Sequence, residues 1–152
     1  MNSDEGNIGL ITNGFGLSMA SNDLLHLMHG KTANYMDLSI ASSIEDVLYG
    51  LDLMEYDKRV KVIFMNVFGG GADVQRIAEG VMISKKMEVL TKPIVIRIRG
   101  YHEEEAHQHL QEFMAENKEA AEKIHIIREM DLAALQACKI AAESELFDLM
   151  KI

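Results

Sequence analysis

The sequence predicts a single α/β domain, residues 1–152, in which helices cover both faces of a parallel sheet. Short apolar segments typical of strands alternate along the chain with segments whose apolar residues recur at helical spacing. One strand segment, residues 60–68, is apolar on both faces, as expected for a central strand between two helical layers. A chain of 152 residues is long enough for one hydrophobic core, and neither a linker nor an internal repeat divides it.

The first strand and helix surround a glycine-containing loop. The strand is expected at residues 7–12, and Asn13, Gly14 and Gly16 follow it. Gly30 is expected to end the helix, because glycine is common at C-terminal caps. The apolar face that predicts this helix consists of Leu17, Ala20, Leu24 and Leu27.

The second and third strands enclose another helix. A weaker strand is expected at residues 32–37. Ser42, with Glu45 three residues later, is a capping-box signature for the helix after it. Its apolar face consists of Ile44, Val47, Leu48 and Leu51. The third strand, residues 60–68, is expected to stop at three consecutive glycines, which are Gly69, Gly70 and Gly71.

The remaining elements repeat the same alternation. A helix is expected after the glycines, and Pro93 is expected to open a fourth strand without disturbing its hydrogen bonds. After a further helix, a fifth strand is expected at residues 124–127, and residues 132–150 are largely helical. A three-layer αβα arrangement of this kind is commonly flavodoxin-like, with the parallel strands in the order 2-1-3-4-5.

This strand order predicts where a ligand binds. The loops after strands 1 and 3 would lie side by side at the carboxyl edge, at the topological switch point. Each loop leads into a helix N-terminus, whose free amides suit a carboxylate or phosphate. We therefore expect a small anion to be held mainly by backbone, with Asn13 orienting it. The expected backbone contacts are Gly14, Gly16, Gly69, Gly70 and Gly71. The alternative is that these glycines only allow the chain to turn.

Asp73 follows this second loop and has two interpretations. A carboxylate in the first turn of a helix stabilises the helix dipole, which is a structural role. It would also repel an incoming phosphate and could occupy the anion site itself.

Other residue types argue against several functions. A net charge of −9 disfavours nucleic-acid and anionic-membrane surfaces. No apolar run is long enough to cross a bilayer, and residues 1–6 resemble neither a signal peptide nor a transit peptide. Cys138 is expected to be a buried, inert thiol. No catalytic residue and no metal site is expected, and three histidines without zinc spacing are expected on a solvated helix face: His102, His107 and His109.

Five segments carry a resemblance to a known family. In order and with matching spacing they resemble the GNIG…NGAGLAMA, ANFLD, NIFGG, IADG and PVVVR segments of succinyl-CoA synthetase β subunits. The matching stretches here are residues 6–20, 33–37, 66–70, 77–80 and 93–97. The resemblance covers residues 6–100 and is to the C-terminal CoA-ligase domain of that subunit, which has the flavodoxin-like fold.

The resemblance implies a role in succinate–CoA ligation, with ADP or GDP formed. It implies that succinate binds at Asn13 and at the loop of Gly70, Gly71 and Ala72, and that the helix after this loop faces a phosphohistidine. It implies an α-type subunit that brings CoA and the phosphohistidine. No cofactor is expected on this chain, so nucleotide and magnesium would come from partner chains, including a separate ATP-grasp chain. The family's place in the tricarboxylic acid cycle implies the mitochondrial matrix in a eukaryote and the cytoplasm in a bacterium.

The sequence also departs from the family. The ATP-grasp part is not in this sequence, so the chain is expected to be inactive alone. Residues 39–41 replace a glycine triplet, Asp73 aligns with an arginine, and Arg99 stands where the family often has Glu or Gln. Two hypotheses follow. The chain is a component of an acid–CoA ligase, or it is a catalytically degenerate structural or regulatory subunit of a larger assembly. In either case, apolar side chains of the last helix are expected to serve a partner surface, namely Leu146, Phe147, Leu149 and Met150.

Overall fold

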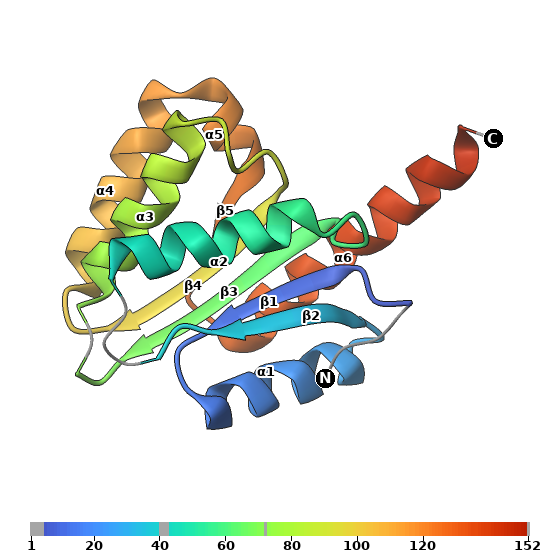
Figure 1. Ribbon diagram of the computed structural model, residues 1–152, viewed down its shortest axis with the longest axis horizontal. Coiled ribbons are helices and arrows are strands. Elements are labelled where there is room, and N and C mark those ends of the chain that lie inside the picture. The colour runs from blue at the N-terminus through green and yellow to red at the C-terminus, as the bar shows by residue number, and fades with distance from the viewer. Residues whose placement is uncertain (1–4, 40–42, 72, 152) are drawn as a thin grey trace.

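The predicted sheet topology is confirmed. The computed structural model describes residues 5–39, 43–71 and 73–151. Its five strands are all parallel and lie in the order β2-β1-β3-β4-β5 (Figure 1). The strands are β1 (Ile8–Thr12), β2 (Thr32–Asp37), β3 (Val62–Gly69), β4 (Ile94–Gly100) and β5 (Ile124–Ile126).

Helices form a layer on each face of the sheet (Figure 1). One layer contains α2 (Ile44–Tyr56), α3 (Val74–Lys86) and α4 (Glu103–Glu116), and the short α5 (Lys118–Lys123) follows α4. The other contains α1 (Phe15–Leu27) and α6 (Met130–Met150). In α6 the buried side chains are all alanines, Ala133, Ala134, Ala137 and Ala141, and small side chains let the helix lie close against β3 and β4.

The core follows the two-residue period of the strands. In β3, Ile63, Met65 and Val67 face the α2–α4 layer, whereas Val62 and Phe64 face α1 and α6. All five are fully buried, as predicted for a central strand covered on both sides.

Two helix caps were predicted at the wrong residues. The capping box of α2 is formed by Ser43 and Asp46, because Ser43 is the last residue before the helix; Ser42 lies outside the described residues. The left-handed residue after α1 is His29, with φ 63°, and not Gly30. Gly30 is required for packing instead, since a Cβ there would lie 2.6 Å from Cys138 Sγ.

Other differences concern element ends. β1 begins one residue later than predicted and β5 ends one residue earlier. β3 is shifted to residues 62–69 and includes Gly69, because Gly69 still pairs with Gly100 of β4. The helix α5 was not predicted. The last turns of α6 project beyond the sheet (Figure 1). As expected, four apolar side chains of these turns are exposed: Leu146, Phe147, Leu149 and Met150.

Close packing of α2 on α3 depends on Gly80. A Cβ at this position would lie 2.6 Å from Val47 Cγ1 and 2.8 Å from Val47 Cβ. We expect Gly80→Ala to lower the free energy of unfolding by about 1–3 kcal/mol through overpacking, although alanine is the better helix former. Urea unfolding would measure this. Gly16→Ala in α1 is the control, because a Cβ there meets no atom within 4 Å. A Gly80→Ala protein as stable as the parent would contradict this packing argument.

Candidate functional site

The loops after β1 and β3 form an open hollow at the carboxyl edge. Because β1 and β3 are neighbours, their ends meet there. The hollow has a volume of about 630 Å³ and is lined by Asn13, Gly14, Gly16, Leu17, Ala20, Phe68, Gly70 and Gly71. It brings together five of the seven predicted site residues. Gly69 does not line it, and Ala72 lies outside the described residues.

Asn13 joins the two loops to each other. Its Nδ2 donates to Phe68 O at 3.0 Å, and its Oδ1 accepts from Phe68 N at 2.8 Å. The carboxamide therefore extends the contact between β1 and β3 to Phe68, beyond Thr12–Asn66, the last backbone pair of the two strands. Asn13 is 7% exposed and lines the hollow, and its carboxamide can still make further hydrogen bonds.

A carboxylate of this chain already uses one amide of the first loop. Gly14 N donates to Asp37 Oδ1 at 2.6 Å, and Ser39 N donates to the same oxygen at 2.9 Å. Asp37 ends β2, the strand next to β1, and the sequence did not indicate that it would reach this loop. The Gly14 amide thus binds a carboxylate, as predicted for a ligand, but this carboxylate belongs to Asp37 of the same chain.

Further amides remain at the start of α1. The first hydrogen bond of the helix runs from Ser18 N to Gly14 O at 3.0 Å. The amides of Phe15, Gly16 and Leu17 precede it and so have no acceptor within the helix. Among the residues that the structure describes, no side chain caps this helix, and its first turn has no acidic residue. A small anion could accept from these amides.

A buried polar layer supports the hollow from below. Asn66 Nδ2 donates to Ser21 Oγ at 2.8 Å, and Arg97 Nη1 donates to Asn66 Oδ1 at 2.9 Å. Arg97 Nε reaches Arg128 O at 3.0 Å. Burial of the guanidinium, with Arg99 close by, lowers the pKa of Arg97. These bonds join α1, β3, β4 and the segment after β5, which fixes the strand ends that carry the loops.

Asp73 is the N-cap of α3, one residue before the position predicted for it. Its Oδ1 accepts from Gln75 N at 3.1 Å and from His102 Nδ1 at 3.0 Å. Partial burial by itself raises the pKa of Asp73, but the bonds from His102 and Gln75 outweigh it and leave that pKa below its ordinary value. The structural interpretation of Asp73 is therefore supported, because its carboxylate stabilises the helix start.

Large apolar side chains are exposed at the edge that carries the hollow. Phe15, Met19, Phe68 and Tyr101 are all exposed. They come from α1 and from the ends of β3 and β4, at the same edge as the glycine loops. Exposed apolar groups gathered at one edge are typical of a surface that a partner covers.

The other candidate residues have structural roles. His107 was expected on a solvated face, but it is 3% exposed, and burial lowers its pKa. It lies three residues before Leu110 and faces the core with it. Cys138 is half-buried, and burial raises the pKa of its thiol, in keeping with an inert side chain.

The described part of the chain contains no group of three or more His, Cys, Asp or Glu residues that could hold a metal ion. Across the same part, no helix is long and apolar enough to cross a membrane.

Fold and site together define an open α/β domain whose carboxyl edge carries a hollow lined mainly by two glycine loops. The family model described as CoA-ligase matches residues 11–140, and the chain belongs to this family. It is 34% identical over 139 residues to the succinate–CoA ligase [ADP-forming] subunit beta 2 of Archaeoglobus fulgidus, covering 91% of this chain and 35% of that protein. It is 40% identical over 102 residues to the [GDP-forming] subunit beta of Thermus thermophilus, covering 67% and 27%. The chain thus spans about a third of the length of the curated relatives it matches.

Solved structures support the fold at lower identity. A protein of Pyrococcus horikoshii superposes with a TM-score of 0.73 at 18% identity, covering 91% of this chain and 36% of that one. The dinucleotide forming acetyl-coenzyme A synthetase 1 of Ca. Korarchaeum cryptofilum, in complex with phosphate and ADP, gives a TM-score of 0.70 at 15% identity, covering 99% and 36%. The named relatives are bacterial and archaeal, so the predicted mitochondrial location and the tricarboxylic acid cycle stay predictions.

The bridge made by Asn13 is open to a direct test. Asn13→Ala removes both bonds to Phe68 and leaves two backbone groups without these partners. We expect the free energy of unfolding to fall by about 2 kcal/mol, as measured by urea unfolding. Gln108→Ala, on the exposed face of α4, is the control. An Asn13→Ala protein with the stability of this control would show that the bridge does not hold the loops together.

The cap made by Asp73 predicts a pH-dependent stability. Because its folded pKa is depressed, its contribution is present above the ordinary aspartate pKa and is lost as the pH falls through the lower, folded value. Asp73→Ala should lower the free energy of unfolding by about 1 kcal/mol at pH 7. The difference from the parent should shrink below a pH of about 4. Urea midpoints at both pH values would measure it, with Asp23→Ala on the exposed face of α1 as the control. A difference that stays constant with pH would contradict a role for the charge.

Proposed function

We propose that this chain is the part of a succinate–CoA ligase that faces the carboxylate and phosphate groups of the reaction, and that it is inactive alone. The observation that carries the proposal is the hollow between the two glycine loops, with amides of Phe15, Gly16 and Leu17 available at its edge. Family membership and the relatives named succinate–CoA ligase support it. The proposed substrate contacts are Asn13, Gly14, Gly16, Gly69, Gly70, Gly71 and Ala72.

The residues of this chain would bind and orient, and they would not react. Backbone amides can hold a carboxylate or phosphate oxygen without a charged side chain. The Asn13–Phe68 bridge keeps the two loops at a fixed separation. CoA, a phosphohistidine, nucleotide and magnesium would be supplied elsewhere in the assembly, by an α-type subunit and an ATP-grasp unit. That partner would cover the exposed apolar side chains of this edge, and the contact would exclude water. These side chains are Phe15, Met19, Phe68 and Tyr101.

A second candidate is a catalytically degenerate subunit with a structural or regulatory role. Two specific observations favour it. Asp37 already accepts the Gly14 amide, and Asp73 places a carboxylate at the start of α3, where the family resemblance implies an arginine. Both carboxylates would oppose a phosphate at this edge.

A native pull-down of the tagged chain, followed by mass spectrometry and a ligase assay, separates the two candidates. We expect α-type CoA-binding and ATP-grasp partners, and formation of succinyl-CoA from succinate, CoA and nucleotide by the recovered complex. The chain alone should give no activity and no saturable heat with ATP or CoA in calorimetry. A partner set without such chains and without activity would favour the degenerate subunit.

A variant tests whether the hollow itself takes part. Gly16→Glu adds a carboxylate at a position with space for a side chain, so the fold should tolerate it. In the active complex we expect kcat/KM for the acid to fall at least about tenfold, because the added charge repels the substrate. Ala142→Glu, which adds the same single charge at an exposed position of α6, is the matched control. Equal activity of the two variants would remove the hollow from the proposed site.

A further inference from the structure

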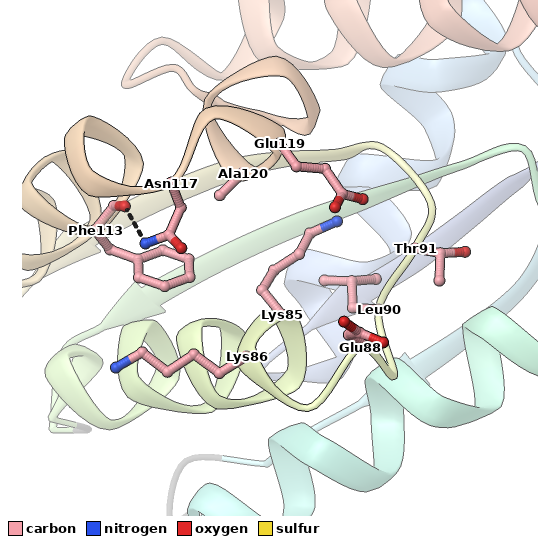
Figure 2. Close-up of a pocket in the computed structure, with 9 residues that line it drawn as sticks. All are labelled: Lys85, Lys86, Glu88, Leu90, Thr91, Phe113, Asn117, Glu119 and Ala120. Atoms are coloured by element: carbon pink, nitrogen blue, oxygen red, sulfur yellow. Dashed lines mark hydrogen bonds between the residues drawn. The ribbon is translucent and has the colours of Figure 1, made fainter.

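A second hollow lies at the opposite, amino edge of the sheet. It has a volume of about 380 Å³ and is formed by the end of α3, the segment before β4, the end of α4 and the start of α5 (Figure 2). Its lining residues are Lys85, Lys86, Glu88, Leu90, Thr91, Phe113, Asn117, Glu119 and Ala120. Leu90, Phe113 and Ala120 are buried and form an apolar floor. The proposed function uses none of these residues.

Lys85 lines this hollow as a half-buried side chain with few partners for its charge among the described residues. Its side chain points from α3 toward Glu119, whereas Lys86 points away from it (Figure 2). Lys85 Nζ makes one long hydrogen bond, 3.4 Å to Lys92 O. Among the residues that the structure describes, no carboxylate forms an ion pair with it within 4.0 Å. Glu119 is paired instead with Lys123, at 2.8 Å.

Lys92, close to Lys85, shows the contrasting arrangement. Its Nζ donates to Met54 O at 2.8 Å, to Glu55 O at 2.7 Å and to Asp57 O at 2.7 Å. Three carbonyls accept from all three N–H groups of the ammonium, although burial still lowers the pKa of Lys92. The Lys85 amine has no such set of acceptors.

The environment of Lys85 favours its neutral form. Burial of the amine, together with the positive charge of Lys123, lowers the pKa of Lys85 to about 8. Glu119 and Glu55 act in the opposite direction but do not restore the ordinary value. About a tenth of these amines would therefore be neutral and nucleophilic near pH 7, far more than for an exposed lysine.

We propose that the Lys85 amine is a modification site that acyl thioesters acylate. The neutral Nζ attacks the thioester carbonyl, a C–N bond forms and the C–S bond breaks. The thiol leaves with the proton that the nitrogen loses, and no oxidant or reductant is needed. The hollow admits a short acyl chain against Leu90 and Phe113. The choice of thioesters rests on the proposed function, since a CoA-ligase subunit meets them, but the reaction itself needs only the amine and an acyl-CoA.

The test uses acetyl-CoA with the whole chain at a pH of about 7.5 and quantifies each acetylated lysine by mass spectrometry. We expect Lys85 to react about tenfold faster than the adjacent, exposed Lys86, because its larger neutral fraction outweighs its lower basicity. Lys92 should react slowest. The rate at Lys85 should level off above a pH of about 8. Lys85 reacting no faster than Lys86, or at a rate that keeps rising well above that pH, would overturn the proposal.

A variant checks the cause without touching the amine. Lys123→Gln removes the neighbouring positive charge and leaves Glu119 unpaired, and both changes raise the pKa of Lys85. We expect acetylation of Lys85 at a pH of about 7.5 to slow at least about twofold, with Lys86 unchanged as the internal control. Unchanged acetylation of Lys85 would overturn the electrostatic cause. No outcome depends on ligase activity, so failure here is distinguishable from failure of the proposed function.

Discussion

The parallel pairing of β1 with β3 runs from Ile8–Val62 to Thr12–Asn66, and the side chain of Asn13 continues it at Phe68. Residues 13–61, which contain α1, β2 and α2, separate these strands in the sequence, but no strand lies between β1 and β3 in the sheet. This long-range pairing makes the ends of β1 and β3 adjacent and so creates the hollow. The polar layer of Ser21, Asn66 and Arg97 then fixes those ends from below. A site made of backbone amides needs this rigidity, because amides cannot adjust as long side chains do.

The two helix N-termini at this edge differ in what they can offer a ligand. α3 is capped by Asp73, so part of its positive end is already neutralised within the chain. α1 has no side-chain cap, and Asp37 takes only the Gly14 amide that precedes the helix. An anion at this edge would therefore be held mainly by α1 and would approach two carboxylates. The amides of α1 would attract an anion, and the two carboxylates would repel it. For this reason both a ligase component and a degenerate subunit are compatible with the same hollow.

The sheet order and the glycine loops were predictable because they depend on local periodicity and on general rules of parallel sheets. What failed depends on contacts distant in sequence or on a choice between neighbours. Ser42 and Ser43 both have an acidic residue three positions later, so the pattern could not decide which one caps α2. Gly30 is needed against Cys138 of α6, which no local pattern indicates. The burial of His107 had a signal, its spacing of three residues from Leu110, but the surrounding acidic residues obscured it.

Charged side chains are bound by different backbone groups at the two edges of the sheet. At the carboxyl edge, carboxylates of the chain accept from backbone amides, as Asp37 does from Gly14. At the amino edge, backbone carbonyls accept from an ammonium, as three of them do from Lys92. The direction of the helices produces this division, because Gly14 is the N-cap of α1, whereas Met54 and Glu55 lie in the last turn of α2 and Asp57 is its C-cap. Lys85 lies at the amino edge but has only one distant carbonyl. Its amine therefore has one carbonyl acceptor where that of Lys92 has three, whereas burial lowers the pKa of both lysines. We expect this difference in acceptors, added to burial, to make Lys85 the more reactive of the two.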